Sequence, residues 1–234
     1  MITTAIILAG GLGTRLKPLT DEVPKSLVPV KNKPLLQHQI EHFHRCGVTN
    51  IILSVGYKEE QIKAYFGEGA KFGVRITYSP ESLPLGTGGA IKKAAQGATQ
   101  PFFLQWGDNL LDIDWREMER EYLSYRTSII MALTPREDVE NFGAAKLDGN
   151  KIIRFVEKPK REEAPSNLIN AGAFILHPEV LKILPEGTSS IEKDCFEKLA
   201  PLGKISAYIH QGQWFPTDTM EKYEIAKEEF QPPC

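Results

Sequence analysis

Three glycines and an arginine follow directly on a short apolar run near the start of the chain. The apolar residues 5–8 predict a buried strand, and Gly10, Gly11 and Gly13 come immediately after it. Because glycine has no Cβ, the backbone N–H groups at such positions can approach a ligand closely. Arg15 adds a fixed positive charge and a planar set of donors that suits phosphate. The pattern predicts a loop that holds a polyphosphate.

Two common glycine-loop motifs do not account for this spacing. Counted from Gly11 and Gly13, a dinucleotide-binding fingerprint needs a third glycine at the position that Leu16 holds. A P-loop needs Gly-Lys followed by Ser or Thr, and the sequence contains no such tripeptide. The phosphate-binding loop must therefore be of another kind.

The segment from Leu8 to Leu16 resembles the signature of the sugar-1-phosphate nucleotidyltransferases, Leu-Ala-Gly-Gly-x-Gly-Thr-Arg-Leu. The family's downstream proline, threonine and lysine are Pro18, Thr20 and Lys25 here. The resemblance implies an enzyme that joins a nucleoside triphosphate to a sugar 1-phosphate and releases pyrophosphate. It also implies that Arg15 and Lys25 are the catalytic cations. The residues of this segment that we assign to the nucleotide are Leu8, Ala9, Gly10, Gly11, Gly13, Thr14 and Arg15.

A second glycine-rich segment, residues 79–90, resembles the family's base-binding loop, Pro-Leu-Gly-Thr-Ala/Gly-Gly. Glu81 stands where the family has an upstream Glu or Gln. Three glycines would let a flat base lie against the backbone. The resemblance adds Glu81, Gly86, Thr87 and Gly88 to the predicted nucleotide site.

Two aspartates are the predicted ligands of Mg²⁺, which is the expected cofactor because Mg²⁺ prefers carboxylate oxygens and neutralises phosphate charge. Asp108 follows Gly107, and this Gly-Asp matches the family's first metal position. The family's common Trp-x-Asp pattern would place the second aspartate at Pro216. The segment instead resembles the Trp-x-Pro-x-Asp-Thr form of the cytidylyltransferase branch, which predicts Asp218. The structural alternatives are a turn cap for Asp108 and a helix N-cap for Asp218.

Three later motifs resemble those with which the family holds the sugar phosphate. In the Glu-Lys-Pro motif, Lys158 would bind the phosphate and Glu157 a sugar hydroxyl. Asn170 begins an Asn-x-Gly motif that contacts the sugar in the family, and Gly143 stands where the sugar approaches the backbone. The resemblance therefore predicts Gly143, Glu157, Lys158 and Asn170 as the sugar-phosphate site.

Three histidines lie on one predicted helix, and His38 and His42 have the i,i+4 spacing of a metal-binding pair. The apolar face of this helix runs through Ile40 and Phe43. We therefore expect His38, His42 and His44 on the polar side of the helix, without a metal.

Length and composition are those of an ordinary globular protein. The 234 residues are 41% hydrophobic, which is enough for a well-buried core. A formal net charge of −2 does not favour nucleic acid as a partner, and no apolar run approaches the length of a membrane span. Three cysteines without a Cys-x-x-Cys pair indicate free thiols. We expect a cytoplasmic enzyme that binds neither nucleic acid nor membrane, and the family resemblance is compatible with a homodimer.

Strand-like and helix-like segments alternate in the first half of the chain. This alternation predicts a Rossmann-like α/β fold with a mostly parallel central sheet and helices on both faces. The second half predicts a small β-rich sugar-binding portion. We expect one catalytic domain over residues 1–234, without the C-terminal β-helix that some family members carry. The predicted strands are residues 5–8, 51–55, 74–78, 102–104, 128–133 and 170–176, with a hairpin over 144–156; the predicted helices are 34–47, 58–66, 89–95, 178–184 and 220–230.

The base and the sugar stay open at this point. The second glycine-rich segment and residues 112–114 resemble guanylyltransferases, which favours GTP with a mannose- or heptose-type 1-phosphate. Residues 214–219 favour CTP instead. The alternatives are a CTP- or UTP-dependent transferase for a sugar 1-phosphate or a phosphocholine-type acceptor, and a non-catalytic regulatory subunit that binds a nucleotide sugar. The presence of Arg15 and Lys25 favours an enzyme.

Overall fold

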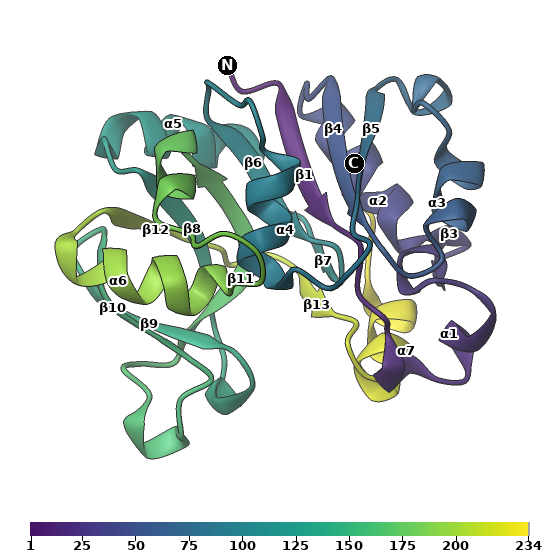
Figure 1. The fold of residues 1–234 in the computed structure, drawn as a ribbon. Coiled ribbons are helices and arrows are strands. Elements are labelled where there is room, and N and C mark those ends of the chain that lie inside the picture. The colour runs from purple at the N-terminus through teal and green to yellow at the C-terminus, as the bar shows by residue number, and fades with distance from the viewer. Residues whose placement is uncertain (234) are drawn as a thin grey trace. The chain divides into compact units, whose positions relative to one another are not determined.

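The computed structural model describes residues 1–233, which form two compact units (Figure 1). Each unit collects segments that are far apart in the sequence. β6 (Phe102–Trp106) and α5 (Trp115–Tyr125) contain points at which the chain passes from one unit to the other. Unit 1 consists of Met1–Ile2, Leu85–Leu104 and Arg116–Gln211; unit 2 consists of Thr3–Pro84, Gln105–Trp115 and the described residues from Gly212 onward.

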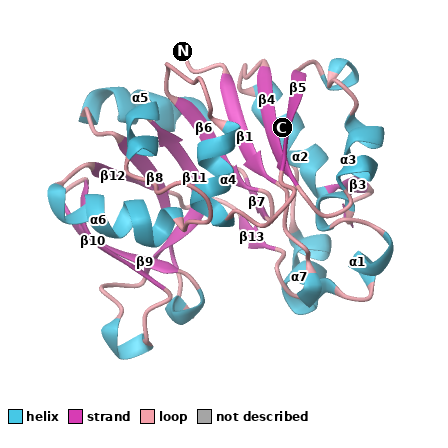
Figure 2. Ribbon diagram, in the orientation of Figure 1, coloured by secondary structure: helices cyan, strands magenta, loops and turns pink. Residues whose placement is uncertain are grey.

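Three parallel strands form the sheet of unit 2, in the order β5-β4-β1 (Figure 2). The side chains of β1 and β4 are largely buried and apolar, as expected for parallel strands that are covered on both faces, whereas β5 exposes Arg75, Thr77 and Pro80. The alternation of strands and helices predicted for this part of the chain is confirmed. The elements are β1 (Thr4–Leu8), α1 (Leu19–Glu22), β2 (Pro29–Val30), β3 (Lys33–Pro34), α2 (Leu35–Arg45), β4 (Asn50–Val55), α3 (Glu59–Phe66), β5 (Arg75–Pro80), β7 (Asn109–Leu111), β13 (Trp214–Pro216) and α7 (Met220–Glu229).

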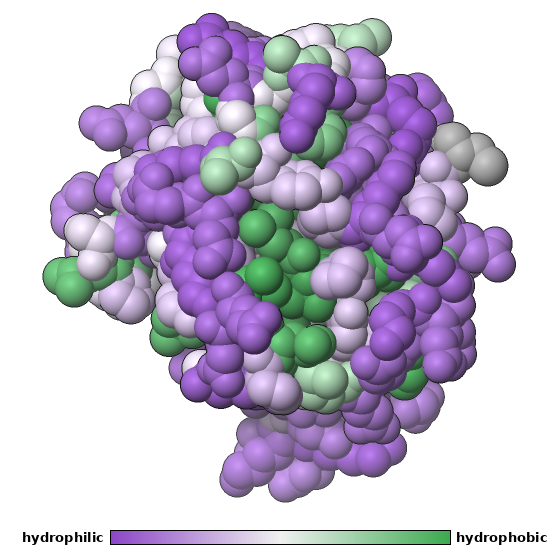
Figure 3. Space-filling view, turned by 90° about the vertical axis from the view of Figure 1, so that its right-hand side faces the viewer, coloured by the Kyte–Doolittle hydropathy of each residue, from purple (hydrophilic) through white to green (hydrophobic). Residues whose placement is uncertain are grey.

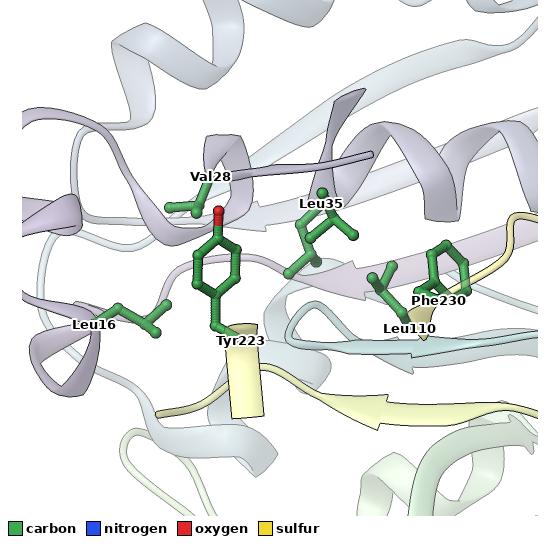
Figure 4. Close-up of a cluster of buried hydrophobic side chains, with 7 residues drawn as sticks. Leu16, Val28, Leu35, Leu110, Tyr223 and Phe230 are labelled. Carbon is green, nitrogen blue, oxygen red and sulfur yellow. The ribbon is translucent and has the colours of Figure 1, made fainter. Parts of the chain in front are cut away.

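A buried apolar cluster packs α7 against the segment that follows the first glycine loop (Figure 4). Tyr223 of α7 lies among these side chains, and its hydroxyl donates a hydrogen bond to the carbonyl oxygen of Pro29 at 2.7 Å. The C-terminal helix is thereby fixed to the N-terminal part of unit 2. The cluster consists of Leu16, Val28, Val30, Leu35, Leu110, Tyr223 and Phe230.

The prediction that the histidines lie on the polar side of α2 is wrong for two of them. His38 and His42 are only 4% and 8% exposed, whereas His44 is exposed as expected. The Nε2 atom of His38 lies 2.7 Å from the carbonyl oxygen of Val30, because the β2–β3 hairpin covers this side of the helix. Burial, with the positive charge of Arg45, lowers the pKa of His42 to about 4. Among residues 1–233, no cluster of three or more His, Cys, Asp and Glu side chains could hold a metal.

Unit 1 contains a mixed sheet in which β11, β8, β12, β10 and β9 follow one another. β12 and β8 are parallel, whereas β11–β8, β10–β12 and β10–β9 are antiparallel. The predicted hairpin is confirmed as β9 and β10, and it closes at Gly149, whose φ is +57°. The elements are α4 (Gly86–Ala94), β8 (Ile129–Pro135), β9 (Gly143–Asp148), β10 (Lys151–Glu157), β11 (Leu168–Leu176), α6 (Glu197–Leu199) and β12 (Ile205–Ile209).

The described chain has no helix that is both long and apolar enough to cross a membrane. One face carries a central group of hydrophobic side chains surrounded by hydrophilic ones (Figure 3). Some exposed apolar surface is normal for globular proteins.

Candidate active site

The predicted site residues fall into two groups, one in each unit. Unit 2 contains the first glycine loop with Glu81, the two predicted catalytic cations and the two predicted metal ligands. Unit 1 contains Gly86, Thr87 and Gly88 of the second glycine-rich segment and the four predicted sugar-phosphate residues. Each group can be built from its own contacts.

The first glycine loop contains glycines of two kinds. Gly13 has a φ of +64°, and its carbonyl oxygen accepts a hydrogen bond from the Thr20 hydroxyl at 2.9 Å. Gly10 packs closely on Gly56. A Cβ added to Gly56 would lie 3.1 Å from the carbonyl oxygen of Gly10. Gly11 is exposed, and a Cβ added there would meet no atom within 4 Å. The backbone conformation of Gly13 therefore favours glycine, and Gly10 has little room for a Cβ, whereas Gly11 leaves its backbone open to a ligand.

Glu81 lies beside this loop, just beyond the end of β5. Its carboxylate accepts a hydrogen bond from the Ser54 hydroxyl at 2.8 Å, and its N–H donates to the Val55 carbonyl at 2.7 Å. A Cβ on Gly10 would lie 3.2 Å from Glu81 Oε1. Glu81 and the glycine loop thus share the carboxyl ends of parallel strands, which is where α/β sheets bind ligands.

The two predicted metal ligands lie on neighbouring segments of one small antiparallel pair, β7 and β13. Pro216 pairs with Asn109, and the next residue, Thr217, donates hydrogen bonds from its N–H and its hydroxyl to the Asp108 carbonyl, both at 2.9 Å. Asp108 and Asp218 therefore flank a backbone contact. Asp218 is not the N-cap of α7, because the cap is the next residue, Thr219.

Each of these aspartates is paired with a predicted catalytic cation. Arg15 Nη1 lies 2.8 Å from Asp218 Oδ2, and Lys25 Nζ lies 3.0 Å from Asp108 Oδ2. The Arg15 side chain is 67% exposed, whereas that of Lys25 is 13% exposed. Lys25 is thus held in place, and Arg15 has room to move to a ligand.

A third cation, Lys222, contacts the other oxygen of Asp218, with its Nζ 3.1 Å from Oδ1. Burial alone would raise the pKa of Asp218. The hydrogen bond and charge of Lys222, together with the charges of Arg15 and Lys25, outweigh burial and hold this pKa below its usual value. Lys222 belongs to none of the sequence motifs above, although its i,i+4 spacing from Asp218, at the start of a predicted helix, indicates an ion pair.

The glycines of the second glycine-rich segment form the first turn of α4. The helix begins at Gly86, three residues earlier than predicted. A Cβ on Gly86 or Gly88 would clash with Ser189, and one on Gly89 would clash with the Gly187 carbonyl. Because these glycines have no side chains, residues 187–189 can pack directly against this turn. Their packing stabilises a helical turn that glycine by itself disfavours.

The four predicted sugar-phosphate residues come together at one end of the β9–β10 hairpin. Gly143 and Glu157 are direct partners across the hairpin, and a Cβ on Gly143 would lie 2.8 Å from Glu157 Oε2. Lys158 follows with a φ of +49° and an exposed side chain, its Nζ 3.9 Å from Glu157 Oε1. On β11, Asn170 comes next to Ile169, the residue that pairs with β9. The Oδ1 atom of Asn170 accepts a hydrogen bond from the N–H of Gly172 at 2.8 Å.

Glu157 is the strongly perturbed carboxyl group of this hairpin. Burial raises its pKa to about 7, and the nearby charges of Glu192 and Glu197 add to the rise while Lys158 and Lys193 oppose it. A carboxyl group that titrates near neutrality can either donate or accept a hydrogen bond. Such a group suits recognition of a sugar hydroxyl.

We expect Gly86→Ala to destabilise the protein more than Gly97→Ala does. Both glycines have a positive φ, of +67° and +83°, so both substitutions introduce backbone strain. Only at Gly86 would the new Cβ meet the Ser189 carbonyl; at Gly97 it would meet nothing within 4 Å. The clash should add about 1–3 kcal/mol to the loss in free energy of unfolding, measured by urea denaturation. Equal losses in the two variants would contradict the packing role of Gly86.

A glycine loop at strand ends, with two cation–carboxylate pairs beside it, suits the handling of a triphosphate and a divalent metal. The chain belongs to the nucleotidyl transferase family, whose model matches residues 4–231. This confirms the predicted class of enzyme. The predicted α/β fold class is confirmed as well, with a mixed sheet.

Two curated relatives and one solved structure illustrate the relationship. The chain is 35% identical over 231 residues to the D-glycero-alpha-D-manno-heptose 1-phosphate guanylyltransferase of Aneurinibacillus thermoaerophilus, covering 97% of this chain and 98% of that protein. It is 38% identical over 216 residues to the mannose-1-phosphate guanyltransferase beta-B of Xenopus laevis, covering 90% of this chain but only 59% of that protein. HddC from Yersinia pseudotuberculosis superposes with a TM-score of 0.83 at 29% identity, covering 98% of this chain and 100% of that one. HddC has also been determined in complex with GMP-PN.

Proposed function

We propose that this chain is a Mg²⁺-dependent guanylyltransferase that joins GTP to a mannose- or heptose-type sugar 1-phosphate and releases pyrophosphate. The observation that carries the proposal is the pairing of Arg15 with Asp218 and of Lys25 with Asp108 beside the first glycine loop. The names of the relatives above support guanine as the base and a mannose or heptose 1-phosphate as the acceptor.

The donor set fits Mg²⁺. This ion is commonly held by one or two carboxylates, with phosphate oxygens and water completing its coordination. Asp108 and Asp218 supply two carboxylates from segments that the Thr217 hydrogen bonds hold together. When bound, Mg²⁺ would draw negative charge away from the α-phosphate oxygens.

The chain's own residues supply positioning and charge. Backbone N–H groups around Gly11 bind the triphosphate, and Arg15 and Lys25 stabilise the charge that develops on the departing pyrophosphate. Lys158 holds the phosphate of the acceptor, and Glu157 contacts a hydroxyl of its sugar. The acceptor oxygen is already an anion when it attacks the α-phosphorus, so no general base is required.

Pyrophosphate release across a panel of substrates tests this proposal. We expect GTP with mannose 1-phosphate or a heptose 1-phosphate to give a kcat/KM at least about 10-fold above that with CTP, UTP or ATP, a difference of about 1.4 kcal/mol. Omission of the sugar phosphate, or addition of EDTA, should stop the release. A preference for CTP or UTP would favour the alternative that residues 214–219 suggest. Tight nucleotide binding without turnover on any pair would favour a regulatory subunit.

Four further expectations go with this proposal: a single catalytic domain over residues 1–234, a cytoplasmic location, a homodimer, and no nucleic-acid or membrane partner. Light scattering after size exclusion measures the oligomeric state.

A further inference from the structure

The segment at residues 187–192 is bound to the first turn of α4 by hydrogen bonds in both directions. The N–H of Ser189 donates to the Leu85 carbonyl, and the N–H of Gly88 donates to the Ser189 carbonyl, both at 2.9 Å. The N–H of Ile191 donates to the Thr87 hydroxyl at 3.0 Å. These hydrogen bonds fix the conformation of the first turn of α4, which carries the predicted nucleotide residues Gly86, Thr87 and Gly88 and is called the nucleotide segment below.

Glu192 completes this connection from a buried position. Its side chain is among the buried charged groups, with 8% exposure, and its Oε2 accepts hydrogen bonds from the hydroxyls of Thr87 at 2.6 Å and Ser190 at 2.7 Å. Thr87 thus accepts a hydrogen bond from Ile191 and donates one to Glu192. The glutamate also begins a π-helical turn, Glu192–Phe196, a backbone form that is often found at functional sites.

The helical turn that begins at Glu192 also lies near the β9–β10 hairpin, which carries the predicted sugar-binding residue Glu157. The charge of Glu192 disfavours ionisation of Glu157, and so does that of Glu197, whose Oε1 accepts the Glu157 N–H at 2.9 Å. The charged groups that act against this effect are Lys158 and Lys193. One buried carboxylate therefore touches the nucleotide segment and influences the sugar-binding carboxyl group.

We propose that Glu192 is a positioning residue for both predicted subsites of unit 1. It holds the first turn of α4 through Thr87, and it begins the helical turn that leads to Glu197, which accepts the Glu157 N–H of the sugar-binding hairpin. This inference rests on the proposed function, because that function defines the two subsites. A neutral Glu157 can donate a hydrogen bond to a sugar hydroxyl oxygen, which an ionised one cannot do. Because its charge disfavours ionisation of Glu157, Glu192 helps to determine which hydrogen-bonding form of Glu157 meets the acceptor.

Glu192→Gln tests the electrostatic role, because it removes the charge and keeps the shape. We expect the titration midpoint of the Glu157 carboxyl carbon, followed by NMR of glutamate-labelled protein, to fall by about one pH unit from its value near 7. The peak is assigned by its loss in Glu157→Gln. Glu186→Gln is the matched control, since Glu186 is an exposed glutamate of the same unit that pairs with Lys92. It should leave the midpoint unchanged.

Thr87→Val and Glu192→Ala test the positioning role. We expect each to raise the Kd for GTP by about 10-fold, because the hydrogen bond that fixes the nucleotide segment is lost. Glu192→Gln keeps an acceptor oxygen for the Thr87 hydroxyl and should have a smaller effect. If Glu192→Ala does not fold, Thr87→Val gives the same information. Calorimetric titration of GTP measures all of these constants.

A Glu157 midpoint in Glu192→Gln equal to that of the wild type would overturn the electrostatic role. Wild-type affinity for GTP in Thr87→Val would overturn the positioning role. Neither measurement requires turnover, so both remain distinct from failure of the proposed function, which the substrate panel detects.

Discussion

Asp218→Asn is expected to lower kcat by about 1000-fold or more. Asparagine keeps the shape of the side chain but removes the charge with which Asp218 would hold a divalent metal. Charge stabilisation by a bound metal contributes several kcal/mol to the transition state, and about 4 kcal/mol corresponds to this factor. Pyrophosphate release with GTP measures the effect, and the far-ultraviolet circular dichroism of the variant should match that of the wild type.

The chain offers a matched control for this substitution. Asp138 is paired with Arg136 at 2.8 Å, the same separation as between Asp218 and Arg15. Asp138→Asn should leave kcat within about twofold of the wild type, because surface ion pairs contribute little. If Asp218→Asn turned over at a near-normal rate, the second metal ligand would have to be another residue.

Arg15→Ala is expected to lower kcat/KM by at least about 100-fold, the usual effect of losing one donor that stabilises transition-state charge. The guanidinium is exposed, so its removal should change stability little. Arg15→Lys should recover part of the loss, since lysine restores the charge but not the planar pair of donors. The measurement is initial-rate kinetics with GTP varied at saturating sugar phosphate.

Arg136→Ala serves as the control, because it breaks an equally short ion pair outside the predicted site. It should be kinetically silent. An unchanged rate in Arg15→Ala would remove Arg15 from the mechanism and leave Lys25 as the one predicted catalytic cation.

Much of the fold followed from local patterns in the sequence. The runs that became β1 and β4 are apolar because both faces of these strands are covered, and this signal does not depend on distant residues. The spacing of Gly10, Gly13 and Arg15 is likewise a property of one segment. Such features can be predicted because the residues that determine them are neighbours in the chain.

Features that depend on tertiary contacts could not be predicted in this way. The β2–β3 hairpin buries His38, and the helical periodicity of α2 alone gives no sign of that cover. The early start of α4 at Gly86 depends on residues 187–189, about a hundred positions away in the sequence. Glu192 had no motif to identify it, because its importance lies in what it contacts across the unit.

The backbone contact beyond β13 bears on the unusual position of the proposed second carboxylate. The strand ends at Pro216, Thr217 donates hydrogen bonds from its N–H and its hydroxyl to the Asp108 carbonyl, and Asp218 follows in a bend before α7. The proposed pair of metal ligands is therefore tied together through the residue between Pro216 and Asp218, and not through the position of Trp214. If Asp218 holds the metal as proposed, a search for one fixed tryptophan–aspartate spacing overlooks chains that bring the two carboxylates together in this way.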